Sequence, residues 1–345
     1  MSPAPFKILI VGPSWVGDMV MAQSLFIALK ALRPDAIIDV LSLASTAALL
    51  KRMPEVNQTI AMPVSHGVFG LKTRLKIGRS LQVSKYNQAI VLPNSWKSAL
   101  IPWFAKIPIR TGWKGEARYG LLNDLRILNK TFLPLMVQRF VSLAYSAKQA
   151  HIAPRYPFPK MIAEQVNSNL PSLQAKKKRL ILCPGAEFGP AKQWPASSYA
   201  EVAKLLLDRG WQVLILGSEA DNETGAALVN AVSAEQQSEV HNLCGKTQLE
   251  DAIDLLATAD AVVSNDSGLM HITAALQTPL VAIYGPTSPN FTPPLSNNAQ
   301  LVQLEVECGP CFQRTCPEQH HKCMKEISGA MVIPLIEKQL LGTPR

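Results

Sequence analysis

The sequence predicts an α/β protein made of two successive doubly wound domains, each with a parallel sheet. Short apolar runs alternate with segments of helical length, which is typical of βαβ units. A proline-rich stretch, Pro154 to Pro171, interrupts this alternation, and the same rhythm then begins again. At 345 residues the chain has room for two domains. We expect two such halves to face a central ligand cleft.

The first half begins with a strand at once. Its predicted strands are Lys7 to Val11, Ile37 to Leu41 and Ala89 to Leu92. Met19 to Arg33 has a helical pattern, and residues 40–60 and 95–105 are predicted as helix or loop. We assign residues 1–170 to a first domain that includes the linker.

The second half repeats the pattern and ends in a helix. Its predicted strands are Arg179 to Cys183, Gln212 to Leu216, Val240 to Leu243, Ala261 to Ser264 and Leu280 to Tyr284. Its predicted helices are Pro195 to Arg209, one after Asp221, Leu249 to Thr258, one after Gly268, and Ile327 to Leu341. We assign residues 171–326 to a second domain and residues 327–345 to a terminal helix able to pack back on the first.

The composition is that of an ordinary globular protein, with 48% hydrophobic and 17% charged residues. No run of about 18 apolar residues occurs, so we expect no membrane-spanning helix. The chain starts with a strand and shows no secretory leader. We therefore expect a cytoplasmic protein.

The net charge of +9 is unevenly distributed. Residues 1–150 contain 19 Lys and Arg against 6 Asp and Glu, whereas residues 151–345 contain 15 against 19. A basic first half favours a polyanionic partner: a nucleic acid, an anionic membrane or a phosphorylated substrate. A solvated basic face without a partner is the alternative. The basic residues concerned are Lys72, Arg74, Lys76, Arg79 and Lys85, followed by Lys97, Arg110, Lys114 and Arg118.

The first turn, "VGPSWVGDMVM", is neither a dinucleotide fingerprint nor a phosphate-binding P-loop. The spacing of Gly12 and Gly17 does not fit the dinucleotide fingerprint. A P-loop needs a lysine at the position of Asp18. A carboxylate here would repel a triphosphate but could accept a proton from a sugar hydroxyl. Capping of the following helix is the alternative role for Asp18.

Three further loops follow strands of the second half, at the sheet edge where ligands bind in parallel folds. "CPGAEFGPAKQWP" carries Lys192, which could neutralise a diphosphate leaving group or simply be solvated. "LGSEADNE" carries Glu219 and Asp221, suited to ribose hydroxyls or to a helix cap. "LCGKT" is no P-loop, because Val240 occupies the position of the required glycine.

A fourth loop of this kind begins the stretch "SNDSGLMHITAALQTPLVAIYGPTSP", where a strand is joined directly to a helix. Ser267 and Gly268 open that helix, whose free N–H groups and dipole suit a phosphate. Asp266 would repel a phosphate, so we expect it near sugar hydroxyls, with simple helix capping as the alternative. His271, one turn further, either faces the same cleft or packs beneath it.

These stretches together resemble one family, the ADP-heptose:lipopolysaccharide heptosyltransferases, which belong to glycosyltransferase family 9 and have the GT-B fold. The resemblance extends over nearly the whole chain. It also involves "RMPEVN", "VLPNSWKSAL" and "RTGWKGEARYGLLND". "GPSWVGDM" and "PGAEFGPAK" are most similar to members that add the second inner-core heptose.

The resemblance implies two Rossmann-like domains and an inverting transfer of L-glycero-D-manno-heptose from ADP-heptose to the first heptose of heptosyl-Kdo2-lipid A, at the inner membrane. It implies Asp18 as the base and Lys192 as the donor-phosphate contact. It implies that Asp221, or else Glu219, contacts the ribose hydroxyls, and that Thr247 lies on the adenine side of the donor. Donor phosphate and heptose contacts then fall on Asp266, Ser267, Gly268 and His271.

No Asp-x-Asp pair occurs in the chain, so the usual metal-chelating pair for a sugar diphosphate is missing and we expect no cofactor for catalysis. A separate segment, "CGPCFQRTCPEQHHKC", gathers four cysteines and two histidines. It predicts a structural Zn²⁺ site, disulfides or free thiols, and the cytoplasm disfavours disulfides. Its cysteines are Cys308, Cys311, Cys316 and Cys323.

Two other functions remain as alternatives. A different acceptor, as in heptosyltransferase I, would keep the chemistry and change the partner. A sugar-nucleotide epimerase would share the two-domain architecture and act on the donor alone. A nucleic-acid binder is disfavoured, because only 6% of the residues are aromatic and the glycines lie at strand ends.

Overall fold

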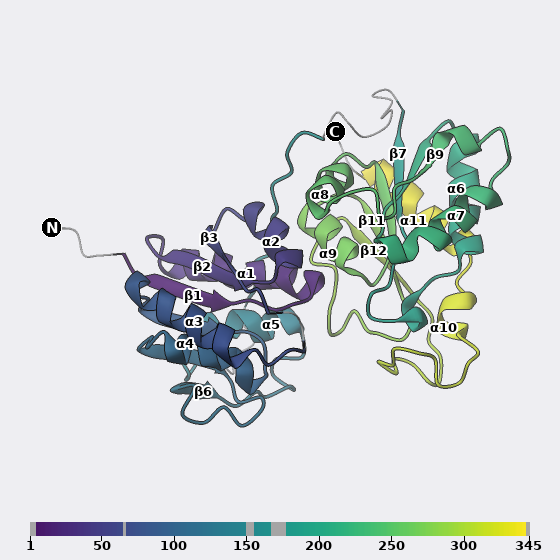
Figure 1. The fold of residues 1–345 in the computed structure, drawn as a ribbon. Coiled ribbons are helices and arrows are strands. Elements are labelled where there is room, and N and C mark those ends of the chain that lie inside the picture. The colour runs from purple at the N-terminus through teal and green to yellow at the C-terminus, as the bar shows by residue number, and fades with distance from the viewer. Residues whose placement is uncertain (1–4, 65–66, 150–154, 167–176, 343–345) are drawn as a thin grey trace. The chain divides into compact units, whose positions relative to one another are not determined.

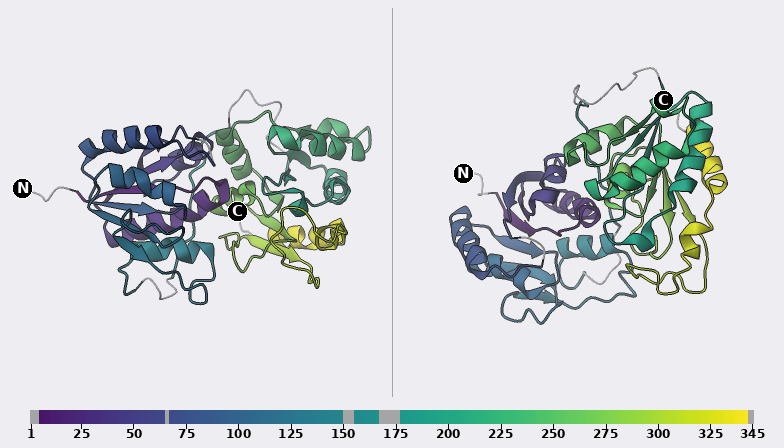
Figure 2. Two further views of the ribbon diagram at one scale, coloured as in Figure 1. Left: turned by 60° about the horizontal axis from the view of Figure 1, so that its bottom comes forward. Right: turned by 45° about the vertical axis from the view of Figure 1, so that its right-hand side comes forward.

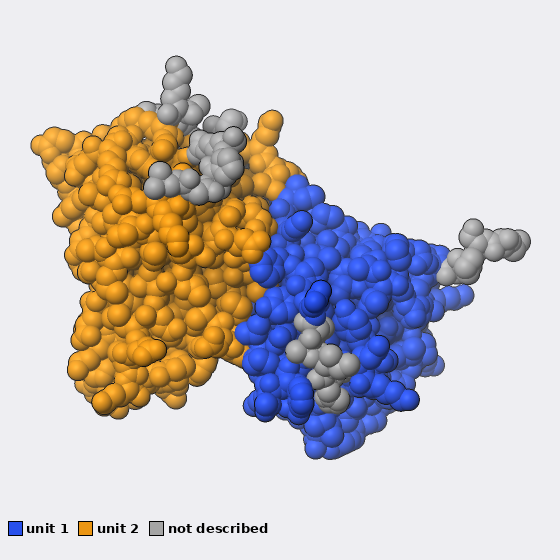
Figure 3. All heavy atoms as spheres, turned by 180° about the vertical axis from the view of Figure 1, so that it is seen from behind, with its two compact units in different colours: residues 1–162 blue, residues 163–345 orange. Residues whose placement is uncertain are grey.

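The computed structural model describes residues 5–64, 67–149, 155–166 and 177–342 and divides the chain into two compact units, Met1–Ile162 and Ala163–Arg345 (Figure 3). Side-chain contacts explain this boundary. The amide of Gln23 bonds both the N–H and the C=O of Lys160, at 3.0 and 2.7 Å. Four residues later the N–H of Glu164 donates to Asp254 at 2.7 Å, within the second unit. The chain therefore passes from one unit to the other at residue 162, before the predicted boundary at 170; residues 154 and 167–171 of the predicted linker lie outside the described residues.

Unit 1 is a parallel sheet flanked by helices (Figures 1 and 2). Its strands are β1 (Lys7–Val11), β2 (Ile37–Ser42), β3 (Val56–Ala61), β4 (Gln88–Val91), β5 (Ile109–Trp113) and β6 (Asp124–Arg126). Its helices are α1 (Val16–Leu32), α2 (Ala44–Lys51), α3 (Leu71–Leu81), α4 (Leu100–Phe104) and α5 (Met136–Val141). The strand order is β3-β2-β1-β4-β5-β6.

Unit 2 repeats this plan. Its strands are β7 (Arg179–Cys183), β8 (Gln212–Ile215), β9 (Val240–Asn242), β10 (Ala261–Asn265), β11 (Leu280–Tyr284) and β12 (Ala299–Gln303). Its helices are α6 (Ala196–Asp208), α7 (Asn222–Ala231), α8 (Leu249–Ala257), α9 (Gly268–Ala275), α10 (Lys322–Lys325) and α11 (Gly329–Gly342). The strand order is β12-β11-β10-β7-β8-β9, again all parallel.

Both sheets have the order of the dinucleotide-binding fold, 3-2-1-4-5-6 when the strands of each unit are counted from its start. The order reverses between β1 and β4 in unit 1, and between β7 and β10 in unit 2. Connections leave in opposite directions at this switch point, and in folds of this order ligands bind at the carboxyl ends of these two strands. Each unit therefore has one preferred place for a ligand.

The central strands form because their apolar residues run without interruption and are buried on both faces. Every residue of β7, β10 and β11 is buried. The predicted bounds of β1, β7 and β11 are confirmed. The strands β3, β5, β6 and β12 were not predicted, because they are short or mix polar with apolar residues. β3 begins within the stretch 40–60, which we expected to be helix or loop.

The terminal helix α11 packs against α6 and β11 of its own unit, where Val332 and Ile336 join the core. The described part of the predicted terminal segment 327–345 therefore belongs to the core of unit 2, and residues 343–345 lie outside the described residues. Gln339 adds a hydrogen bond from its amide to the carbonyl of Leu280 in β11, at 2.8 Å. None of the helices in the described ranges is long and apolar enough to cross a membrane.

Candidate active site

The carboxyl ends of β7 and β10 hold an ion pair between two of the predicted site residues. The ammonium group of Lys192 lies 2.6 Å from Oδ2 of Asp266, and both side chains are largely buried, with 13% and 5% of their surface exposed. The hydroxyl of Thr287 donates to the same oxygen at 2.7 Å. Lys192 also lies over the ring of Phe188, 4.8 Å from its centroid. Lys192 is therefore not a solvated surface lysine, and the switch point of unit 2 contains one fixed cation.

The loops that carry these residues are held together by Asn265, the last residue of β10. Its amide nitrogen donates to the carbonyl of Pro184 after β7, at 2.7 Å. Its amide oxygen accepts from the N–H of Trp194 at 3.1 Å and from the hydroxyl of Tyr199 at 2.9 Å. Asn265 is fully buried, so these bonds exclude water. Because Lys192 lies between Pro184 and Trp194 in sequence, Asn265 fixes both ends of its loop.

The helix α9 begins directly beside this ion pair. Ser267 is its N-cap residue, and its hydroxyl accepts from the N–H of Met270 at 3.3 Å. Gly268 is the first helical residue, and the first N–H groups of a helix have no partner within it. The start of α9 thus offers N–H donors and a positive dipole end next to Lys192. This arrangement suits an anion.

His271 is buried in the first turns of α9, with Nε2 3.9 Å from Oδ1 of Asp266. Burial lowers the pKa of His271 to about 4, although the carboxylate of Asp266 acts in the opposite direction. The ring is therefore neutral at physiological pH, and the short distance to Asp266 is not an ion pair there. His271 thus lies beside Asp266 as a buried, neutral ring.

Asp221, Glu219 and Thr247 surround the ends of the next strands, β8 and β9. The carboxylate of Asp221 accepts from both the N–H and the hydroxyl of Ser218, at 2.8 Å each, as a helix cap. It also lies against Gly185, where a Cβ would come within 2.5 Å of it. The carboxylate of Glu219 covers Gly245 in the same way. Thr247 follows in the turn that leads to α8.

The predicted donor residues therefore form one row along the carboxyl edge of the second sheet. Asp266, Ser267, Gly268 and His271 follow β10, Lys192 follows β7, and the group of Asp221, Glu219 and Thr247 follows β8 and β9. Adjacent strands are about 4.8 Å apart, so this row spans roughly 15 Å. An elongated ligand would fit along it.

Asp18 occupies the corresponding position in unit 1. It is the third residue of α1, which begins after the short turn that follows β1, the strand at the switch point. Its side chain is partly exposed. The turn is tight at Gly12, where a Cβ would meet the side chain of Met19 at 2.6 Å. The fold therefore places one carboxylate at the preferred ligand position of unit 1.

Two of the basic residues that we assigned to a polyanion surface are buried instead. Arg74 donates through Nε to the carbonyl of Phe69 at 2.6 Å. Arg118 is fully buried and donates to the carbonyls of Pro93, at 2.7 Å, and Trp113. Burial lowers the pKa of Arg118 to about 10. Both arginines shape loops at the carboxyl end of the sheet, and neither is available to an external anion.

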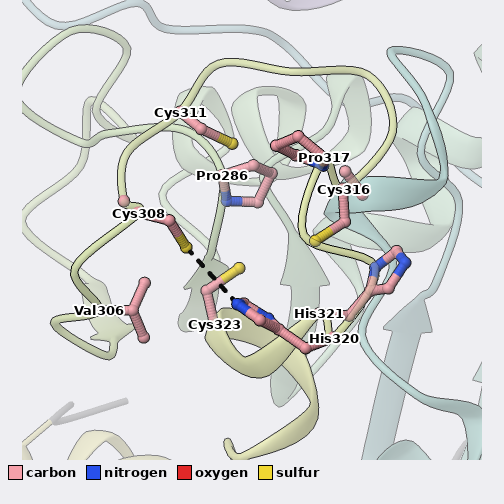
Figure 4. A pocket seen from close by; sticks show the side chains of 11 residues that line it. Pro286, Val306, Cys308, Cys311, Cys316, Pro317, His320, His321 and Cys323 are labelled. Carbon is pink, nitrogen blue, oxygen red and sulfur yellow. Dashed lines mark hydrogen bonds between the residues drawn. The ribbon is translucent and has the colours of Figure 1, made fainter.

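The four cysteines of the predicted metal segment line one small cavity together with His320 and His321 (Figure 4). The distance from Cys308 Sγ to His320 Nε2 is 4.0 Å. The pKa of the Cys323 thiol is raised to about 11. Burial is the main cause, and the neighbouring sulfurs of Cys308, Cys311 and Cys316 act in the same direction. All four are free cysteines.

Sequence reasoning missed Thr287 and Asn265 as site residues. Thr287 follows β11 in "YGPTSP", at the same sheet edge as the predicted residues, and this position was its signal. Asn265 precedes Asp266 and was hidden at the end of an apolar run. Asn265 holds neighbouring loops together, and only the strand order shows which loops are its neighbours.

Two successive units with the dinucleotide-binding strand order have the architecture of the GT-B glycosyltransferases, and the comparisons identify the class. The chain belongs to glycosyltransferase family 9 (heptosyltransferase), whose sequence profile matches residues 74–322. It is therefore a transferase.

Several relatives are similar over nearly their whole length. The chain is 52% identical to lipopolysaccharide heptosyltransferase 2 of Salmonella typhimurium, over 95% of this chain and 96% of that protein. It is 48% identical to lipopolysaccharide heptosyltransferase 2 of Escherichia coli, over 97% and 99%. The solved structure of E. coli ADP-heptose lps heptosyltransferase II matches with a TM-score of 0.87 at 47% identity, covering 97% of this chain and 99% of that one.

Proposed function

We propose that this protein transfers L-glycero-D-manno-heptose from ADP-heptose to the first heptose of the lipopolysaccharide inner core, the reaction of a heptosyltransferase II. The observation that carries the chemistry is the Lys192–Asp266 pair at the start of α9. The choice of reaction is supported by the 48–52% identity to two proteins named lipopolysaccharide heptosyltransferase 2.

ADP-heptose would lie along the row of residues at the edge of the second sheet. The diphosphate would contact Lys192, which is a cation, and the N–H groups at Ser267 and Gly268, which carry the partial positive charge of a helix start. Asp221 and Glu219 would accept from ribose hydroxyls, and the adenine would lie toward Thr247. Asp266 would accept from heptose hydroxyls with the oxygen that Lys192 and Thr287 leave unused.

The reaction would be a single displacement with inversion at the anomeric carbon. Asp18 removes the proton from the acceptor hydroxyl, whose oxygen forms a bond to the heptose C1. The bond from C1 to the β-phosphate oxygen breaks, and ADP leaves with the electron pair. Lys192 and the start of α9 stabilise the charge that develops on that oxygen. With no Asp-x-Asp pair in the chain, these groups would do so without a metal cofactor.

The acceptor would be heptosyl-Kdo2-lipid A, bound by unit 1 from the cytoplasmic side of the inner membrane. Arg79 of α3 lines a groove of about 610 Å³ together with Trp103 and Lys106. Lys72 and Lys76 are exposed on the same helix. Val83 and Trp103 are exposed apolar side chains of the same region, at 83% and 46%. Basic and apolar groups together suit an anionic lipid surface, where each basic residue contributes about 1 kcal/mol.

The test measures ADP release from ADP-heptose with three acceptors: none, Kdo2-lipid A, and heptosyl-Kdo2-lipid A. We expect rapid release only with heptosyl-Kdo2-lipid A, and a product heavier by one heptose in mass spectra. Faster release with Kdo2-lipid A would indicate a heptosyltransferase I instead. Conversion of the donor with no acceptor present would favour the epimerase alternative.

A further inference from the structure

The segment between β12 and α10, residues 304–321, has a defined path without a helix or strand of its own. We call it the Cys loop. Loops longer than about 15 residues are uncommon inside compact domains and usually have a function. Most side chains of the Cys loop are exposed or only partly buried, so the apolar core contributes little to holding it. Backbone hydrogen bonds and any bound ligand must therefore hold its conformation.

Sulfur atoms gather at the base of this loop. Cys308, Cys311 and Cys316 of the loop and Cys323 of α10 border one cavity of about 10 Å³. Figure 4 shows their four sulfur atoms turned toward one another around Pro286, whereas His321 points away. A volume of this size admits about one water-sized atom. Four thiols around one such space match the ligand number and softness that Zn²⁺ prefers.

The four cysteines are not yet close enough together to coordinate a metal ion in this structure. Within the described ranges, no three His, Cys, Asp or Glu side chains already stand in metal-binding geometry. Zn–S bonds are about 2.3 Å long, so an ion must draw the sulfurs inward by side-chain rotation. The cysteines are free thiols, so no disulfide has to be broken for this contraction.

The Cys loop contacts both segments that carry the anion site. The N–H of Ala191, next to Lys192, donates to the carbonyl of Arg314 at 3.1 Å. The N–H of Phe312 donates to the carbonyl of Pro286, next to Thr287, at 2.7 Å. Contact is closest at Gly189, where a Cβ would come within 2.4 Å of the Arg314 carbonyl. The position of the loop therefore sets the position of Lys192 and Thr287.

We propose that Cys308, Cys311, Cys316 and Cys323 bind one Zn²⁺ ion, which fixes the Cys loop against the turn that carries Lys192. The thiols release their protons on binding and the ion has no part in the transfer reaction. The proposal of a zinc site is argued from the four cysteines alone. Its effect on ADP binding rests on the proposed function. Metal content and ADP affinity are therefore measured separately.

The first experiment measures the metal content of the full-length protein, purified under reducing conditions without chelators. We expect about one zinc per chain, and its loss in the variants Cys311→Ser and Cys316→Ser. Cys244→Ala is the matched control, because Cys244 is a free cysteine of the same unit outside the cluster. Iron in place of zinc, no metal with four titratable thiols, or unchanged zinc in the serine variants would each overturn the proposal.

A second measurement avoids variants that fail to fold. The wild-type protein is stripped with a chelator and reloaded with Co²⁺, and we expect the absorption bands of tetrahedral cobalt bound by thiolates. An octahedral cobalt spectrum without thiolate bands would contradict the site. ADP binding is then compared by calorimetry between the zinc-loaded and stripped protein. We expect stripping to weaken it about tenfold, the size of one lost hydrogen bond to a charged group. Equal affinity would show that the ion does not position Lys192.

Discussion

The ammonium nitrogen of Lys192 and Oδ2 of Asp266 lie 2.6 Å apart at the switch point of unit 2. The pair joins the loop after β7 to the loop after β10. We predict that Lys192→Ala weakens ADP binding and slows transfer, because it removes the cation that faces the leaving group. It should also lower the free energy of unfolding by up to about 3–5 kcal/mol, since Asp266 keeps a buried charge. Calorimetry and urea unfolding measure the two effects, with the exposed Lys178→Ala as control.

Thr287 offers a milder test of the same site. Thr287→Val removes the hydroxyl that donates to Asp266 at 2.7 Å and keeps the side-chain volume. We expect the KM for ADP-heptose to rise about tenfold, the effect of one hydrogen bond to a charged group. Thr287→Ser retains the hydroxyl and should stay close to wild type. Equal kinetics for the valine and serine variants would remove Thr287 from the site.

Asp18 is predicted to act on the acceptor and not on the donor. Loss of a general base typically slows the reaction by about 10²–10⁴-fold. Asp18→Asn should therefore lower kcat by this factor and leave the affinity for ADP unchanged. Asp35→Asn, at an exposed position beyond the other end of α1, serves as the matched control. Full activity of Asp18→Asn, or complete inhibition of the wild type by EDTA, would refute the proposed mechanism.

His271 should make stability depend on pH. Burial lowers its pKa from 6.5 to about 4 in the folded protein, so between these values the unfolded chain binds a proton that the folded protein does not. The free energy of unfolding contributed by His271 is therefore complete above pH 6.5 and is lost as the pH falls toward 4. The slope contributed is at most about 1.4 kcal/mol per pH unit. Urea unfolding at several pH values should give a shallower slope for His271→Asn; an identical slope would contradict the assignment.

The exposed basic residues of α3 are predicted to bind anionic membranes. The triple variant Lys72→Gln, Lys76→Gln, Arg79→Gln should lose binding to phosphatidylglycerol vesicles and raise the KM for the acceptor, with ADP affinity unchanged. The control carries the same loss of charge on unit 2, at the exposed residues Lys178, Lys204 and Lys338. If both triple variants lose vesicle binding equally, net charge and not this surface is responsible. Arg74 is left out because it is buried.

The sequence by itself determined the central strands and the edge at which the site lies. Apolar runs such as Arg179–Cys183 are buried on both faces, so their ends can be read directly, and the polar residues that follow must lie at the carboxyl edge. Lys192, Asp266 and Asp18 were assigned to such an edge in this way, and they follow β7, β10 and β1 in the fold. Strands that mix polar and apolar residues, such as β3 and β12, were not predicted, because they are stabilised by pairing with a neighbouring strand.

Only the tertiary structure decided which of these residues touch. Lys192 and Asp266 are 74 positions apart, and they form a pair because β7 and β10 are neighbours in the sheet. The same pairing of strands brings Asn265 against the loop that carries Lys192, and its hydrogen bonds hold both ends of that loop. A charge pattern also cannot tell an exposed arginine from a buried one, because a long side chain turns inward wherever carbonyls remain unpaired. The folded chain settled this for Arg74 and Arg118, whose guanidinium groups hold loop carbonyls inside unit 1.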